Sequence, residues 1–364
     1  MRFRYFLKVA GADGQNRNIV DDFLRLSFTK RLNGVGLLTF DLPANHDSLA
    51  DYEIDSIITV ERGQKHPSIS SNYYFEFVGL YRGMRKQADR DGRRRVTIYA
   101  QDGMSLLARA IIAWKAGQNG YSQWSNTKVD SIIAQIIQTN YQSASGRVLT
   151  RMTASGGFTR LFLNPLGTPA STTIDYAAAY KNVLAAVQEL TEINNDVVEV
   201  RKSGGDGWTV YINSMGTDRT DSVIFDLGYS NMVNADLDLR RLNEPTKAVV
   251  AGQGEGSTRL TVVQTSANWS EYNHNEIFVD ARDQSTTAVL QARGDAKLAE
   301  EEYRPKFVFN PAQTPACRYG KHYYLGDTIT ARFEGESFAQ KIVGVTMAVD
   351  EQGRESPELE LDDA

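Results

Sequence analysis

The chain has 364 residues, enough for two or three domains of ordinary size. Hydrophobic residues make up 41% and charged residues 23%, which is the balance of a globular protein and not of a disordered chain. The net charge of −5 argues against a protein that coats nucleic acid, because such proteins are usually basic. Cys317 is the only cysteine, so we expect no internal disulfide and tolerance of a reducing compartment.

The first residues carry no recognisable export signal. The apolar run at residues 5–10 is too short for a signal-peptide core, and Lys8 interrupts it. No segment approaches the ~18 consecutive apolar residues that a membrane helix needs. We therefore expect a protein without a membrane span, made and assembled in a cytoplasm.

The first hundred residues alternate between apolar and polar side chains, which is typical of strands with one buried face. The alternation is clearest at residues 24–28, 38–42 and 96–98. Three turn dipeptides separate such segments and predict hairpins, because tight turns favour residues that accept positive φ. They are Asn33-Gly34, Asp91-Gly92 and Asp102-Gly103. Short strands at this spacing predict a small sandwich or barrel.

The middle of the chain changes to helical periodicity. One apolar stripe runs from Val129 to Ile137, preceded by Thr127 with Asp130 three residues later, as in a capping box. A second stripe runs from Tyr180 to Leu190, and Trp208 to Ile212 alternate as a strand. Residues 143–173 are rich in Gly, Pro, Ser and Thr and predict a loop with one strand.

After Pro245 the alternating pattern returns. Two short strands flank the glycine-rich segment 252–256, and a helix is expected over residues 286–302. Alternation resumes at residues 307–309, 329–333 and 343–349. The predicted fold is therefore α+β and β-rich, with a first β-barrel-like domain at 1–110, an α+β insert at 111–240 and a second β-barrel-like domain with one helix at 241–364.

The sequence offers three candidate sites, namely a phosphate loop, a metal site and a reactive cysteine, and it argues against each. Segment 252–256 (G-Q-G-E-G) precedes a strand and contains a glutamate, so it predicts a β-turn and not a phosphate loop. The histidines are not spaced as metal ligands, and Cys317 has no evident oriented base although Arg318, Lys321 and His322 lie nearby. The four histidines are His46, His66, His274 and His322.

Acidic and aromatic residues leave two alternatives open. A glycosidase needs only two well-placed carboxylates, and acids beside strands or turns occur throughout the chain. These acids are Asp55, Glu61, Glu76, Asp102, Asp283 and Asp327. The clusters at 73–75 and 323–324 are aromatic, as carbohydrate platforms are, but sheets and interfaces use aromatics more often. We expect no catalytic, cofactor-binding or metal-binding residues.

Five segments, taken in order, resemble the hub proteins of long-tailed bacteriophage tail tips and baseplates, also found as the N-terminal part of tail-associated lysozymes. They are G-x-G-x-x-x-F-x-L-P at 33–43, V-x-R-G at 60–63, F-x-G-x-Y-R-G at 77–83, V-T-I-x-A-x-D-G-M-S-L-L-A-R-A-I at 96–111 and Y-x-L-G-D-x-I-T at 323–330. The resemblance implies two tail-tube-like barrels in each chain and a homotrimer that matches a six-fold tube.

The same resemblance implies a virion structural protein that forms part of the DNA exit channel and takes part in DNA ejection. Its implied partners are its own copies, the distal tail ring, the tape measure protein, tip or fibre proteins and passing genomic DNA, with no cofactor. The chain ends at Ala364, so we expect no appended lysozyme domain. The alternatives are a carbohydrate-binding adhesin at the tail tip and a cell-wall hydrolase.

The resemblance also leads to an expectation about charge. A basic lumen would grip the DNA phosphates and slow ejection, since a duplex carries about one negative charge per 1.7 Å. We therefore expect a neutral to acidic lumen, with Arg93, Arg94 and Arg95 outside it or paired, and with the two helical stripes at the periphery.

Overall fold

The computed structural model describes residues 3–64, 73–112, 122–142, 161–163, 172–203, 207–214, 216–282 and 284–363. The chain forms two compact units. The first unit comprises Met1–Val233 with Phe309–Ala364, and the second comprises Asn234–Val308. The division into three domains at residues 110 and 240 stays a prediction.

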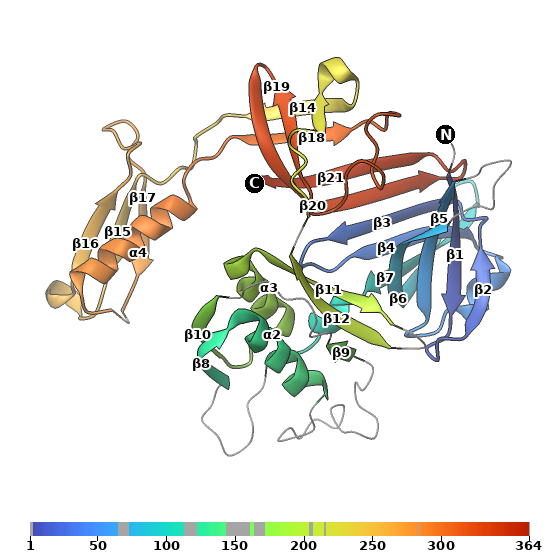
Figure 1. Cartoon of the computed structure of the whole chain (residues 1–364), viewed down its shortest axis with the longest axis horizontal. Coiled ribbons are helices and arrows are strands. Elements are labelled where there is room, and N and C mark those ends of the chain that lie inside the picture. Colours follow the sequence, from blue (N-terminus) through green and yellow to red (C-terminus); the bar gives the residue numbers. More distant parts are fainter. Residues whose placement is uncertain are drawn as a thin grey trace. The chain divides into compact units, whose positions relative to one another are not determined.

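Eleven strands in the described part of the first unit form one mixed sheet, in which the blue N-terminal and red C-terminal strands lie side by side (Figure 1). They are β1 (Phe3–Ala10), β2 (Asn16–Val20), β3 (Arg25–Arg31), β4 (Leu37–Pro43), β5 (Ile57–Gln64), β6 (Tyr73–Ala88), β7 (Arg94–Asp102), β13 (Ile224–Asp226), β19 (Thr328–Phe333), β20 (Glu336–Asp350) and β21 (Glu355–Asp363). The order across the sheet is β13-β19-β20-β3-β4-β7-β6-β5-β1-β2, and β21 pairs with β20. The β-rich prediction is confirmed, and the arrangement in two barrels stays a prediction.

Alternation places one face of each strand in the core, as the sequence predicts. Phe28 and Phe40 are buried with Ile98 and Met347, and each comes from a different strand of the sheet. The phenyl ring of Phe28 lies 6.2 Å from that of Phe77, measured between ring centroids. Strand β20 is shared, because it pairs with β19 through its first residues, with β3 through its last residues and with β21 along most of its length.

Two of the three predicted turns are confirmed and one is wrong. Asn33-Gly34 joins β3 to β4, with Asn33 at φ 48°, and Asp91-Gly92 joins β6 to β7, with Gly92 at φ 77°. Asp102-Gly103 instead precedes helix α1 (Met104–Leu107), where Asp102 accepts a hydrogen bond from the Met104 N–H at 3.0 Å. Asp-Gly serves helix starts as well as hairpins, and local sequence does not separate the two uses.

Two further helices and two smaller strand groups lie in the described part of the first unit. The helices α2 (Val129–Ile137) and α3 (Val183–Asn194) confirm both predicted stripes. Strands β8 (Ser122–Lys128) and β10 (Thr173–Ala178) pair, as do β11 (Asp196–Lys202), β12 (Trp208–Ser214) and β9 (Leu161–Leu163). Short helical turns are η1 (Asp47–Asp51), η2 (Gln138–Gln142) and η4 (Leu227–Tyr229). Segment 143–173 lies mostly outside the described residues.

The helix starts differ from the predictions in two places. Lys128 is the N-cap of α2 and has no side-chain capping bond, whereas Thr127 belongs to β8 and donates to the Ser125 carbonyl. The predicted capping box is therefore wrong. Tyr180 precedes α3 at φ 56° and is exposed, and Asn182 caps that helix by accepting from the Ala185 N–H.

The second unit is a three-stranded sheet with one helix. Its strands are β16 (Thr261–Thr265), β15 (Lys247–Ala251) and β17 (Glu276–Asp280), in that order, with the turn η5 (Gly256–Thr258). Helix α4 (Thr287–Glu300), which is the predicted 286–302 helix, packs Leu290 and Leu298 against Ala248 and Val250. Strands β14 (Met232–Asp238) and β18 (Lys306–Pro311) pair with each other. No helix among the described residues is both long and apolar enough to cross a bilayer.

Candidate functional site

A buried network of charged side chains links the N-terminal strands of the large sheet to its C-terminal strand β21. Arg62 on β5 donates to both carboxylate oxygens of Glu355 on β21, at 2.5 and 2.6 Å. The Tyr5 hydroxyl on β1 donates to the same carboxylate at 2.6 Å. Arg62 also reaches Glu76 at 3.3 Å, and Lys30 binds Glu76 at 3.0 Å. The sheet is therefore curved enough for side chains of β1 and β5 to contact β21.

The network combines two basic and two acidic side chains with the Tyr5 hydroxyl, and its surroundings shift the pKa of Tyr5, Lys30 and Arg62. Burial and the Glu355 carboxylate both raise the pKa of the Tyr5 hydroxyl, which stays protonated. Burial alone would lower the pKa of Lys30, but Tyr319 and Glu76 beside it raise that pKa above its ordinary value. Burial opposes the charge of Arg62 too, but Glu355, Tyr5 and Glu76 together outweigh it and raise the pKa. Groups so firmly held are suited to joining strands and not to exchanging protons with a substrate.

A cavity of about 660 Å³ lies beside this network in the first unit. Its lining joins the sheet to β11 and β12, and includes Lys30 and Glu76 on the one side and Arg201 and Trp208 on the other. Arg201 is paired with Glu199, which is also in the lining. The polar groups of the cavity are thus largely engaged with one another.

Asp102 also lines this cavity and is the most perturbed carboxyl group near it. Burial raises its pKa to about 7, although hydrogen bonds from backbone N–H groups work against that rise. The Gly36 N–H donates to Asp102 at 2.8 Å, so the carboxylate ties the start of β4 to helix α1. The geometry assigns Asp102 a role in holding a helix start, because both of these hydrogen bonds come from the backbone.

The other carboxylates weighed as catalytic acids are held by cations. Asp55 pairs with Arg82, Glu61 with Lys8 at 2.6 Å, and Asp327 with Arg219 at 2.5 Å. Asp327 is buried and also accepts the N–H groups of Thr217 and Tyr324. These contacts fit structural roles. Asp283 lies outside the described residues.

The histidines and the cysteine do not form a reactive or metal-binding group in the described part of the chain. His46 binds Asp22 at 2.9 Å, and His274 binds Glu276 at 2.9 Å. The Nδ1 atom of His322 accepts the Arg318 N–H at 3.0 Å, and burial followed by its basic neighbours lowers its pKa. His66 lies outside the described residues.

Cys317 is buried, and burial raises the pKa of its thiol to about 11. Desolvation therefore sets the direction of this pKa, although Arg318, Lys321 and His322 are close in the sequence.

The aromatic clusters divide between core and surface. Tyr323 is buried, with its ring 5.3 Å from that of Phe225, whereas Tyr324, Tyr74 and Phe75 are exposed. The glycine segment 252–256 is the connection from β15 to β16, as predicted, and Arg259 donates to carbonyls at its base.

The basic triplet Arg93, Arg94 and Arg95 lies at the end of the β6–β7 hairpin and is exposed. Within the described residues, none of the three has a carboxylate within 4.0 Å. The sequence reasoning singled out this triplet but missed Arg85, Lys86 and Arg90 on the same hairpin, which the density of Lys and Arg over residues 85–95 would have revealed. It also missed the roles of Arg62 and Glu355, which no local pattern indicates.

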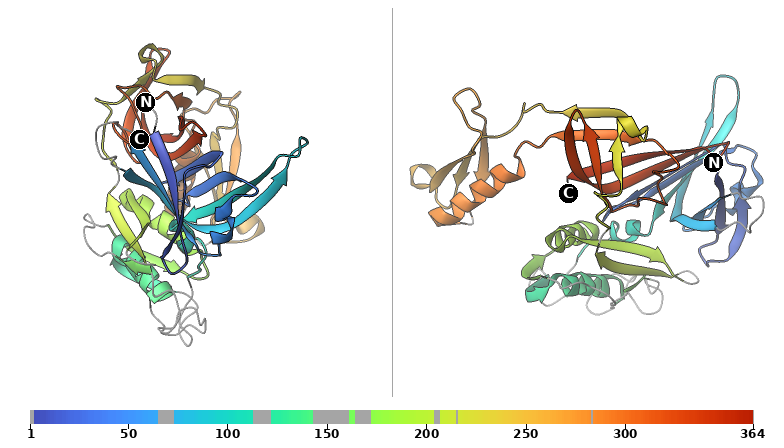
Figure 2. Two further views of the ribbon diagram at one scale, coloured as in Figure 1. Left: turned by 90° about the vertical axis from the view of Figure 1, so that its right-hand side faces the viewer. Right: turned by 45° about the horizontal axis from the view of Figure 1, so that its top comes forward.

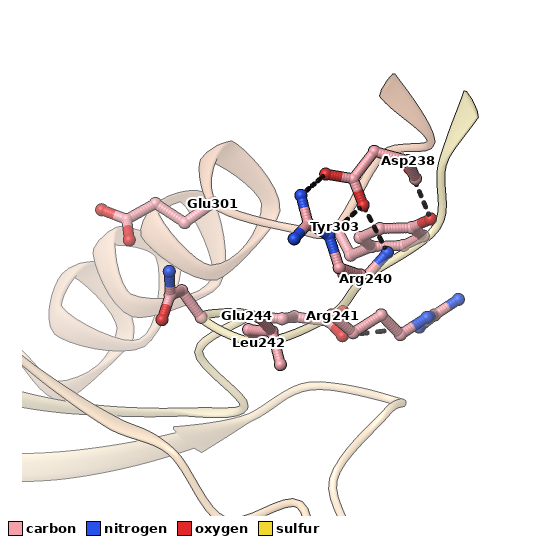
Figure 3. A pocket seen from close by; sticks show the side chains of 8 residues that line it. Asp238, Arg240, Arg241, Leu242, Glu244, Glu301 and Tyr303 are labelled. Atoms are coloured by element: carbon pink, nitrogen blue, oxygen red, sulfur yellow. Dashed lines mark hydrogen bonds and ion pairs between the residues drawn. The ribbon is translucent and has the colours of Figure 1, made fainter. Parts of the chain in front are cut away.

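The second unit has a smaller cavity, of about 370 Å³, at the base of α4 (Figure 3). Asp238 and Arg240 form an ion pair there at 2.6 Å. The guanidinium of Arg241 lies 4.4 Å from the ring centroid of Tyr303, and Arg241 also pairs with the buried Glu244. Asp238 and Glu244 in the lining of this cavity are thus each paired with an arginine of the same lining.

Comparison with solved structures places this fold among bacteriophage tail proteins. The 43 kDa tail protein of prophage MuSo2 from Shewanella oneidensis is similar over 99% of this chain and 98% of its own, with a TM-score of 0.61 and 11% identity. The tail protein from Neisseria meningitidis MC58 is similar over 99% of this chain and 96% of its own, with a TM-score of 0.58 and 12% identity. Prophage tail protein gp18 from Listeria monocytogenes EGD-e is similar over 98% of this chain and 94% of its own, with a TM-score of 0.52 and 14% identity. At these identities the likeness concerns the fold.

The sequence itself matches one family model over nearly its full length. No curated protein matches the chain in sequence. The model of the Siphovirus ReqiPepy6 Gp37-like proteins matches residues 7–361. The resemblance to phage tail proteins that the five sequence segments indicate is confirmed. The chain thus belongs to the Siphovirus ReqiPepy6 Gp37-like family.

Proposed function

We propose that this protein is a structural protein of a bacteriophage tail, that it is the hub subunit at the distal end, and that three copies form a ring around the DNA exit channel. The observation that carries the proposal is the eleven-stranded sheet, whose N-terminal strands β1 and β5 are joined to the C-terminal strand β21 by the bonds of Tyr5 and Arg62 to Glu355. A wall that must stay closed around passing DNA needs such fixed cross-links. In this role the protein works by its shape, and it matches the symmetry of the tube to that of the tip.

The proposal includes the partners and the place of assembly. The ring contacts the distal tail ring and the tape measure protein on one side and tip or fibre proteins on the other. It assembles in the host cytoplasm and is carried in the virion at the tail tip. Genomic DNA passes through the ring without sequence-specific binding. The lumen is neutral to acidic, because a basic lumen would bind the DNA phosphates and slow ejection. Helices α2 and α3 lie at the periphery of the ring.

The role we propose involves no catalysis. Asp55, Glu61, Glu76 and Asp327 are each engaged by a basic side chain, which supports this view. A zymogram against host cell walls tests it. Reproducible clearing that is lost when one of these carboxylates is changed to its amide would establish the hydrolase alternative instead.

The adhesin alternative is favoured by one feature of the second unit. Tyr272 is fully exposed, and Phe278 and Trp269 are 63% and 38% exposed. Exposed aromatic rings are what sugar rings stack on. Binding of purified protein to host cell-wall glycans, lost in Trp269→Ala, would support this function.

Copy number in the virion tests the hub proposal most directly. Quantitative mass spectrometry of purified virions, with the other tail proteins as internal standards, should give three copies of this chain per tail. Reconstruction of the tail tip should place these copies around the axis. A different copy number, or a position on the tail shaft, would refute the proposal.

A further inference from the structure

Strands β6 and β7 continue together as a hairpin beyond their neighbours (Figure 2). Pairing of β6 with β5 ends at Leu80, and pairing of β7 with β4 ends at Arg95. Within the described residues, β6 therefore pairs with β7 alone from Arg82 to Ala88, and no described strand pairs with its other edge there. An open edge of this kind offers hydrogen bonds to another chain.

This hairpin carries a concentration of positive charge in an acidic protein. Residues 85–95 hold six basic and two acidic side chains, whereas the whole chain has a net charge of −5. All six basic residues are exposed, and they are Arg85, Lys86, Arg90, Arg93, Arg94 and Arg95. None of the six has an ion pair within the described residues, and the Asp89 carboxylate accepts the N–H groups of Asp91 and Arg93.

The strand register spreads this charge over both faces of the hairpin. Lys86 lies opposite Val96, so Lys86 and Arg94 share the face that continues the core side of the sheet. Arg85 lies opposite Thr97 and shares the other face with Arg95. Like charges held this close repel one another, and an acidic surface against the hairpin would relieve the repulsion.

The same unit has an acidic counterpart on strand β21. Among the strands that the structure describes, β21 pairs with β20 alone, and none of them pairs with its other edge. Glu358, Glu360 and Asp362 alternate along one face and are exposed, and Glu351 is exposed in the preceding turn. Glu360 pairs with Arg31, but Glu351, Glu358 and Asp362 have no ion pair within the described residues.

We propose that the basic β6–β7 hairpin of one chain docks on the acidic edge strand β21 of a second copy. The two surfaces differ, so each chain offers one of each, and such a head-to-tail contact can close into a ring. The inference rests on the proposed trimer and names the surfaces that would form it. Charge complementarity favours a second copy, because each chain carries both surfaces and most of their charged groups have no ion pair within the described residues.

Duplex DNA is the rival partner of the hairpin. Phosphates would also satisfy the six basic side chains, and a two-stranded ribbon fits the major groove. The acidic strand would then remain unpaired, and residues 85–95 contain no aromatic side chain for stacking on bases. These points favour the second copy.

Charge reversal on each surface tests the proposal. The hairpin variant combines Arg85→Glu, Arg93→Glu and Arg95→Glu, and the strand variant combines Glu351→Lys, Glu358→Lys and Asp362→Lys. By sedimentation velocity, each alone should weaken self-association at least tenfold, and the chain carrying all six changes should recover it. The control is Arg282→Glu, Arg304→Glu and Lys306→Glu in the second unit, which changes net charge as much as the hairpin variant does and should have no effect.

Disulfide trapping tests directly whether the β6–β7 hairpin contacts β21 of a second copy, even where association is weak. Cys317 is buried, so a chain with Arg95→Cys and Glu358→Cys should give covalent oligomers under mild oxidation, in solution or in virions. A chain with Tyr272→Cys and Glu358→Cys is the control and should give few. Equal trapping in both, or none in either, would overturn the inference.

The outcomes separate this inference from the hub proposal and from DNA binding. Three copies per virion with no effect of either charge variant would overturn the docking surfaces and leave the hub intact. Unchanged self-association, together with loss of binding to a fluorescent DNA duplex in the hairpin variant, would assign the hairpin to phosphate instead.

Discussion

Removal of Arg62 should destabilise the first unit far more than removal of a similar arginine at the surface. The Arg62→Met variant loses both bonds to Glu355 and the bond to Glu76. The side chains of Arg62 and Glu355 are 7% and 5% exposed, so the variant leaves a buried carboxylate without its main cation. Breaking a buried pair in this way costs about 3–5 kcal/mol.

The chain contains a matched control for this experiment. Arg31 on β3 makes the same two-bond contact with Glu360 on β21, but those side chains are 41% and 45% exposed. Arg31→Met should therefore cost only about 0–1 kcal/mol. Both ion pairs join β21 to an N-terminal strand, so the difference between the two unfolding free energies reports the effect of burial.

Urea unfolding with linear extrapolation measures the difference, provided that the slope against urea stays constant. A double variant, Arg62→Met with Glu355→Leu, should recover much of the loss, because it leaves no carboxylate unpaired at this position. Equal costs for Arg62→Met and Arg31→Met, or a double variant no more stable than Arg62→Met, would refute the assignment of the network as the link that closes the sheet.

Three further predictions concern single groups. Burial raises the folded-state pKa of Asp102 to about 7, so stability should fall as pH rises from about 4 to above about 7, and Asp102→Asn should flatten that dependence in urea unfolding. Gly103→Ala should cost at least about 2 kcal/mol, since its Cβ would lie 2.4 Å from the Val200 carbonyl oxygen, whereas Gly228→Ala, whose Cβ would meet only Asp226 at 3.2 Å, should cost less in the same assay. Cys317 should react with a thiol reagent at neutral pH only after unfolding, because its pKa is about 11; rapid reaction of the folded protein would contradict this.

Local sequence patterns predicted the elements of this fold better than their arrangement. Alternation located β3, β4 and β7, and helical spacing located α2 and α3, because each pattern lies within a dozen neighbouring residues. Which strands pair is a different matter. β20 pairs with β3 through contacts such as Met347 with Phe28, and nothing local in either segment indicates the other.

The candidate site was even less accessible from sequence. Tyr5 and Glu355 form one hydrogen bond but lie at opposite ends of the chain, so the network was invisible to spacing arguments. The bulge in pairing near Glu61, where Phe77 faces Val60 and Phe75 faces Glu61, leaves Glu76 without a strand partner and free to turn toward Arg62. Bulges of this kind depend on tertiary packing and have no simple sequence signal.

The shared strand β20 has a consequence for synthesis of the protein. Residues 344–350 of β20 pair with residues 25–31 of β3. That edge of β3 therefore stays uncovered until β20 has left the ribosome. Contacts between such distant segments form slowly, and an uncovered strand edge invites pairing between nascent chains. The sheet therefore completes only after β20 has left the ribosome, and truncated chains lacking β20 should aggregate instead of entering assembly.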